Sequence, residues 1–177
     1  MLLSPIVAWA LYKPMRVLSP QLNGITCTSD TICIENKEKI DEAMFLYNEA
    51  LAFVNSSVGI IKKNPRITFC SSEQCYNSFG FYAPAKATTV GISGIVISPR
   101  GWNNYFMRHE IIHHLQSERL GVIGQYLAPE WFKEGMPYSL SKEPKHLKEP
   151  WETYKKKFDD WYHKINKEEL WVNAKEL

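Results

Sequence analysis

Two histidines on one predicted helix constrain the fold of this 177-residue chain more than any other feature. A long helix is predicted over residues 103–120, and Gly121 is expected to end it. Within this helix, the motif His-Glu-Ile-Ile-His at residues 109–113 places the two histidines four residues apart. Residues at this spacing share one helix face, so both imidazoles can reach one metal ion. A further ligand from another part of the chain must then reach the same face.

The residue types of this motif suit a hydrolytic zinc site. Imidazole nitrogens are favoured zinc ligands, and a catalytic zinc ion takes three protein ligands and leaves a fourth position open for water. Glu110 lies beside the first histidine, where it could take the proton of a water that attacks a carbonyl group. The alternative is that His109, Glu110 and His113 lie on a solvent-exposed helix face and bind no metal.

The third ligand is expected downstream of the second histidine. Four nearby side chains could supply it: His114, Glu118, Glu130 and Glu134. His114 points about 100° away from His113 on the same helix, and Glu118 has an unfavourable i+5 offset. Glu130 and Glu134, which lie on the next predicted helix, remain.

A Trp-x-x-Glu-Gly sequence at residues 131–135 follows the two-histidine motif. The pair of motifs resembles the gluzincin metallopeptidases, the thermolysin-like and aminopeptidase-N-like group. In that group the third ligand is a glutamate on a helix after the two-histidine helix. The resemblance covers about residues 94–141, roughly a quarter of the chain.

The resemblance implies a zinc peptidase. It implies that His109, His113 and Glu134 bind Zn²⁺ and that Glu110 is the catalytic carboxylate. The expected reaction is hydrolysis of peptide bonds by metal-activated water, with Glu110 as general base and a peptide or protein as substrate. The alternative is a catalytically idle zinc-binding domain that acts as a peptide- or protein-binding module.

The resemblance also implies an edge strand at residues 94–98, above the active-site helix, that offers backbone groups to an extended peptide. The transition-state oxyanion needs a hydrogen-bond donor, and no spacing argument selects one. The candidates are Tyr138, His114, Tyr154, Tyr162 and His163. Pro137 is expected to bend or end the helix predicted over residues 130–138.

Hydrophobic periodicity predicts the other elements. A helix begins after Asn36 and ends near residues 55–59, with its apolar face at Ile40, Met44, Tyr47, Leu51 and Val54. Strands are expected at residues 66–70 and 94–98, and a short extended piece at 80–84. Residues 71–75 are expected to form a loop, residues 85–93 turns, and the last third of the chain helices. The predicted class is α+β: a small zincin-like domain with a short mixed sheet.

Cysteines and the N-terminus indicate the compartment. Cys27, Cys33, Cys70 and Cys75 fall into two close pairs, which suit two local disulfides in an oxidising compartment, although four reduced thiols remain the alternative. Residues 1–12 are apolar and uncharged, so residues 1–20 are interpreted as the remnant of an anchor or signal and residues 21–177 as one domain. The expectation is an exported protein, periplasmic or tethered to a membrane. An apolar arm packed on the domain is the other interpretation of this segment.

The charge pattern excludes one class of partner. The formal net charge is +2, and lysine and arginine are interleaved with aspartate and glutamate without a basic stripe. A nucleic-acid partner is therefore not expected.

Overall fold

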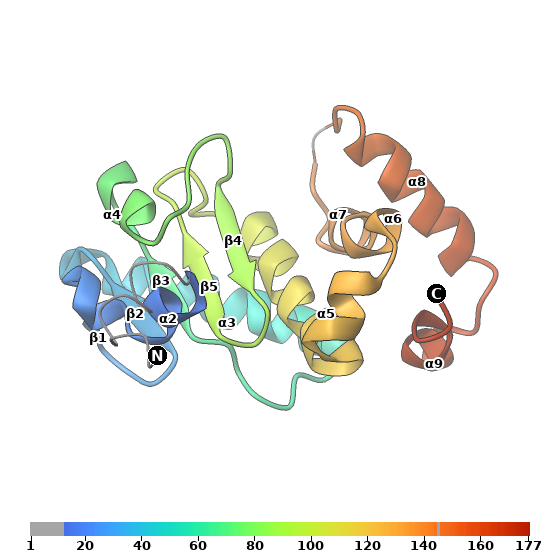
Figure 1. Ribbon diagram of the computed structural model, residues 1–177, viewed down its shortest axis with the longest axis horizontal. Helices are drawn as coiled ribbons and strands as arrows, with labels where there is room; N and C mark the ends of the chain where they lie inside the picture. Colours follow the sequence, from blue (N-terminus) through green and yellow to red (C-terminus); the bar gives the residue numbers. More distant parts are fainter. Residues whose placement is uncertain (1–12, 145) are drawn as a thin grey trace, which may run out of the picture.

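The computed structural model describes residues 13–144 and 146–177, which form an α+β fold (Figure 1). In this part of the chain, five strands form one mixed sheet in the order β1-β2-β3-β5-β4. The strands are β1 (Thr26–Cys27), β2 (Ile32–Ile34), β3 (Ile67–Phe69), β4 (Ala87–Val90) and β5 (Gly94–Ile97). Strands β2, β3 and β5 are parallel, whereas β1 and β4 run antiparallel to their neighbours at the two edges.

Helices cover both faces of the sheet and extend beyond it. They are α2 (Lys13–Leu18), α3 (Ile40–Ser57), α4 (Glu73–Ser78), α5 (Asn104–Leu127), α6 (Glu130–Lys133), α7 (Gly135–Leu140), α8 (Trp151–Tyr162) and α9 (Leu170–Ala174), with 3₁₀ turns at Pro20–Asn23, Lys37–Lys39 and Lys167–Glu169. Figure 1 shows the sheet on one side of α5 and helices α6 to α9 on the other. Helix α5 therefore lies between the sheet and a helical C-terminal part, and the predicted helical last third is confirmed.

The sheet is buried on both faces, as parallel strands usually are. Alternate residues of β2, β3 and β5 pack with α3 and α5 in the main core: Ile32, Ile34, Ile67, Phe69, Ile95 and Ile97. Residues between them, such as Cys33 and Val96, face a second apolar cluster that contains Val17 of α2 and Tyr76 of α4.

Helix α2 lies within residues 1–20, so the folded unit includes residues from Lys13 onward. The apolar segment 1–12 lies outside the described residues.

The predicted helix after Asn36 is confirmed, and its predicted apolar face is confirmed in part: Tyr47 and Val54 are buried, and Ile40 and Leu51 pack against the core. Asn36 caps the 3₁₀ turn Lys37–Lys39, which leads into α3, and its side chain accepts a hydrogen bond from the Glu38 amide. The buried residues of α3 are Ala43, Leu46, Tyr47, Ala50 and Val54, whereas Met44 is 44% exposed. Ala43 and Ala50 are fully buried although an alanine offers little apolar surface.

Several predicted local structures are wrong. Residues 85–93, predicted as turns, contain strand β4, whose Thr-Thr-Val sequence is β-branched and pairs along β5. Residues 80–84, predicted as extended, form a turn with a cis Ala83-Pro84 peptide. The predicted loop after residue 70 contains α4, because the Ser72 side chain accepts a hydrogen bond from the Cys75 amide and caps the helix. Strands β1 and β2 were not predicted.

Two local disulfides, Cys27–Cys33 and Cys70–Cys75, are confirmed in the described residues. The first lies across the paired strands β1 and β2, and the second joins the end of β3 to α4. Within the described part of the chain, no helix combines the length and apolar character that crossing a bilayer requires.

We expect thiol-alkylating reagents to label no cysteine in non-reduced protein taken from its native compartment. Reduction should expose all four cysteines and lower the unfolding temperature modestly, because these disulfides close loops with sequence separations of 6 and 5 residues. Such loops contribute less than the ~3 kcal/mol of a fifteen-residue loop. Mass spectrometry after alkylation measures this, and four labelled cysteines before reduction would place the domain in a reducing compartment.

Candidate metal centre

Helix α5 holds both histidines in one geometry. The side chain of Asn103 caps its first turn by accepting a hydrogen bond from the Phe106 amide at 3.0 Å. Arg108, next to the first histidine, forms an ion pair with Glu49 of α3. The helix places Nε2 of His109 and Nε2 of His113 at 3.2 Å from each other.

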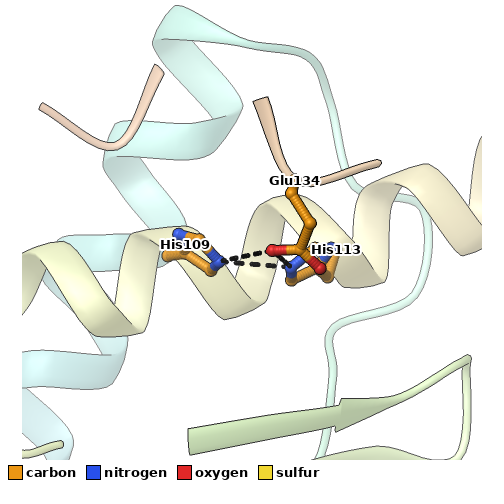
Figure 2. Close-up of side chains that lie close together, drawn as sticks. All are labelled: His109, His113 and Glu134. Carbon is orange, nitrogen blue, oxygen red and sulfur yellow. Dashed lines mark hydrogen bonds and ion pairs between the residues drawn. The ribbon is translucent and has the colours of Figure 1, made fainter. Parts of the chain in front are cut away.

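Glu134, between α6 and α7, reaches the same point. Its Oε2 atom lies 3.9 Å from Nε2 of His109 and 3.8 Å from Nε2 of His113 (Figure 2). All three ligand atoms lie within 4.8 Å of one another. Ligands about 2.0–2.1 Å from a zinc ion at tetrahedral angles are roughly 3.3 Å apart, so this set of two imidazoles and one carboxylate fits zinc.

The other candidate third ligands do not converge on this point. His114 is buried, with Nε2 2.9 Å from the carbonyl oxygen of Lys63. Glu118 accepts hydrogen bonds from the Lys62 and Lys63 amides and so holds a loop to α5. Glu130 is paired with Lys133 at 2.6 Å, and its side chain is 61% exposed.

The predicted single helix over residues 130–138 is two short helices, and the interruption is at Glu134 rather than at Pro137. Pro137 is the third residue of α7, where a helix does not require the amide hydrogen that proline lacks. The Tyr138 amide still donates to the carbonyl of Glu134 at 3.1 Å. The proline is therefore compatible with a helical turn directly after Glu134.

Gly135 of the Trp-x-x-Glu-Gly sequence is needed for packing. A Cβ atom at this position would lie 2.3 Å from the carbonyl oxygen of Tyr154 in α8. Only glycine allows α8 to pack this closely against the start of α7. This contact fixes the turn that carries Glu134.

Glu110 points towards the sheet edge and is only 7% exposed. The hydroxyl Oγ1 of Thr89 lies 2.7 Å from Oε2 of Glu110. Thr89 belongs to β4, so β4 is the edge strand beside α5. The prediction that residues 94–98 form this edge is wrong, because β5 lies between β3 and β4.

Burial sets the protonation of the site. It raises the pKa of Glu110 above its ordinary value, with Glu134 adding to the effect, while His113 and Thr89 oppose it. Burial, together with His113, holds the pKa of His109 well below its ordinary range. His109 is therefore neutral at neutral pH, the form that binds metals.

A cleft of about 670 Å³ contains these residues. Strand β4 forms one wall, and Tyr138 and Trp151 from α7 and α8 contribute to the other. Of the five oxyanion candidates, Tyr138 lines the cleft in the described part of the chain, and its ring packs edge-on against His109 with centroids 4.5 Å apart. Burial and then Glu134 raise the pKa of Tyr138, so its hydroxyl stays protonated and can donate a hydrogen bond.

The structure adds three residues that were not predicted: Thr89, Gln116 and Gln125. Thr89 was missed because β4 was not recognised as a strand. Gln116 contacts Nδ1 of the His113 ring, and Gln125 donates a hydrogen bond to the His113 carbonyl. The sequence offered one indication of Gln116, a polar residue three positions after the second histidine. Comparisons of the chain with protein families, with curated proteins and with solved structures find no match.

Proposed function

We propose that this protein is a zinc-dependent peptidase of the gluzincin type with a zincin-like fold. The observation that carries the proposal is the convergence of His109, His113 and Glu134 in a cleft that also contains Glu110. Two imidazole nitrogens and one carboxylate suit a catalytic zinc ion, because a fourth position remains for water or substrate.

His109, His113 and Glu134 would hold the ion. Zinc, when bound, supplies a Lewis acid that polarises a carbonyl group and lowers the pKa of a water. Glu110 then accepts the proton of the attacking water and returns it to the leaving amine. Thr89 orients the Glu110 carboxylate through its hydroxyl at 2.7 Å.

The walls of the cleft suit an extended peptide. In the described residues, strand β4 lies at one edge of the sheet, so the backbone groups on its outer side have no strand partner there. Such an edge can pair with the backbone of an extended substrate. Tyr138, with a protonated hydroxyl in the same cleft, is the group that we assign as donor to the developing oxyanion.

We also propose that the domain works outside the cytoplasm. Both cysteine pairs are disulfide-bonded, and structural disulfides persist in oxidising compartments. The apolar sequence of residues 1–12 supports a membrane tether or an export signal at this end of the domain.

Metal analysis and peptide hydrolysis test the proposed function together. We expect the purified protein to carry about one zinc per chain. It should also hydrolyse members of a peptide library, and a zinc chelator should abolish this activity. Zinc without hydrolysis would support the peptide-binding module instead, and absence of zinc would mean that the two histidines bind no metal.

A further inference from the structure

Gln116 is fully buried behind the proposed metal-binding residues and contacts two parts of the site. Its Nε2 atom donates to the carbonyl oxygens of Phe132 and Lys133, at 3.3 and 3.2 Å. Its Oε1 atom lies 3.0 Å from Nδ1 of His113. One amide therefore joins the helix that carries His113 to the chain directly before Glu134.

The surroundings allow one orientation of this amide. Carbonyl oxygens only accept hydrogen bonds, so the group that faces Phe132 and Lys133 must be the NH₂ group of Gln116. On the other side, Nε2 of Gln125 donates to Oε1 of Gln116 at 3.2 Å and to the carbonyl of His113 at 3.0 Å. The amide oxygen of Gln116 therefore faces the imidazole.

This orientation determines the tautomer of His113. An amide oxygen cannot donate, so Nδ1 of His113 must carry the ring hydrogen. In the neutral imidazole, Nε2 then has the free lone pair. Nε2 is the atom that lies 3.2 Å from Nε2 of His109 and 3.8 Å from Oε2 of Glu134 (Figure 2). The lone pair of His113 is thus on the nitrogen nearest the other two ligand atoms.

The same amide stabilises the turn before Glu134. Lys133 is the last residue of α6, where a carbonyl has no partner within the helix, and Pro137, four residues later, has no amide hydrogen to supply one. The NH₂ group of Gln116 supplies this missing hydrogen bond. The amide of Gln116 thus pairs carbonyls at the end of α6 and links the turn before Glu134 to α5.

Gln125 reaches the site because α5 is interrupted at Gly121. The backbone there has φ 76° and ψ 156°, a region that only glycine adopts readily. Beyond this break, Gln125 lines the cleft, and Ser117 donates a hydrogen bond to its Oε1 atom. Because Oε1 of Gln125 accepts this bond, Nε2 of Gln125 is the atom that donates to Gln116. Ser117 thus orients Gln125, Gln125 orients Gln116, and Gln116 orients the His113 ring.

We infer that Gln116 is a positioning residue for the zinc site, an inference that rests on the function proposed above. Its oxygen holds His113 in the tautomer that can bind a metal through Nε2, and its NH₂ group holds the turn that carries Glu134. Gln125 orients Gln116. Hydrogen-bond partners of this kind fix the ring orientation of metal-binding histidines and tune metal affinity.

The test uses the full chain with ¹⁵N-labelled histidine and begins before any metal is added. At mildly alkaline pH, the ¹⁵N shifts of the wild-type protein should show a protonated Nδ1 and an unprotonated Nε2 in His113. In Gln116→Met, which lacks the acceptor, a large share of the hydrogen should move to Nε2. Zinc affinity, measured by competition with a chromophoric chelator, should fall roughly 10- to 100-fold.

Two variants separate positioning from general destabilisation. Gln116→Glu keeps an acceptor oxygen towards His113 but loses the NH₂ group that donates to Phe132 and Lys133. It should therefore preserve the tautomer of His113 while zinc affinity still falls, which separates the two roles of the amide. Tyr47→Phe removes a buried hydrogen bond to the carbonyl of Pro65, at 3.3 Å and outside the site, and should change neither. An unprotonated Nδ1 in the wild type, or an affinity of Gln116→Met within about two-fold of wild type, would overturn the inference.

The outcomes distinguish this inference from the proposed function. If the wild-type protein binds zinc and hydrolyses peptides but Gln116→Met binds zinc equally well, only the role of Gln116 is wrong. If the wild-type protein binds no zinc, the proposed function is wrong. The wild-type tautomer is measured without metal and without a substitution, so it tests the orienting role of Gln116 even if Gln116→Met does not fold.

Discussion

Glu134→Ala is expected to remove most of the zinc from the purified protein. The carboxylate supplies one of three converging ligand atoms, and its Oε2 lies 3.8 and 3.9 Å from the two histidine nitrogens. Two imidazoles alone leave half of a tetrahedral coordination sphere to water. The loss of affinity should exceed the roughly 10- to 100-fold that removal of an outer partner costs. Metal analysis after dialysis against a weak chelator measures the effect.

Glu130→Ala is the matched control, because Glu130 is a carboxylate in the same cleft and only four residues away. Its side chain is 61% exposed and paired with Lys133, so its loss should leave the zinc content near one per chain. The reverse result, with zinc lost in Glu130→Ala and kept in Glu134→Ala, would show that the wrong carboxylate has been assigned.

The convergence of His109, His113 and Glu134 could be predicted because most of it is local. His109 and His113 share one helix, and four-residue spacing places their side chains together whatever the rest of the chain does. Glu134 required a second motif, since its approach depends on a turn and on close packing of α8 against Gly135. The sequence left Glu130 and Glu134 open until the resemblance favoured the second, and the geometry agrees with that choice.

The sheet edge could not be predicted from local patterns. Strand β4 has four residues, Ala87–Val90. Its small residues, with Pro84 before them and Gly91 and Gly94 after them, are typical of turns. It is a strand because it pairs with β5, and this pairing is a tertiary interaction. The contact between Thr89 and Glu110 depends on that pairing, so it was missed together with the strand.

The buried face of α3 illustrates a second limit. Met44 was expected on the core face because it is large and apolar, yet it is 44% exposed, whereas the small residues Ala43 and Ala50 are fully buried. Hydrophobic periodicity weights side-chain size, whereas close helix packing favours small residues at the point of contact. The amide of Gln116 was hidden for a related reason, since its partners lie on α6 and beyond the break at Gly121.

Glu110→Gln is expected to lower peptide hydrolysis by about 10²- to 10⁴-fold, the range for loss of a general acid–base group. The amide has the size of the carboxylate, and its oxygen can still accept the hydrogen bond from Thr89. It cannot, however, take a proton from water. Initial rates on the best library peptide, with wild-type protein as reference, measure the effect.

Zinc content decides how a loss of activity in Glu110→Gln is to be understood. Glu110 is not among the three residues whose ligand atoms converge, so the variant should keep about one zinc per chain. The protein should also unfold at an equal or higher temperature, because burial raises the pKa of Glu110 and a neutral amide avoids the cost of burying a charge. Glu130→Gln, the same chemical change at another carboxylate of the cleft, should stay within a few-fold of wild-type activity. A Glu110→Gln variant that retains wild-type rates would remove Glu110 from the mechanism, and one that loses its zinc would make Glu110 a ligand instead of a base.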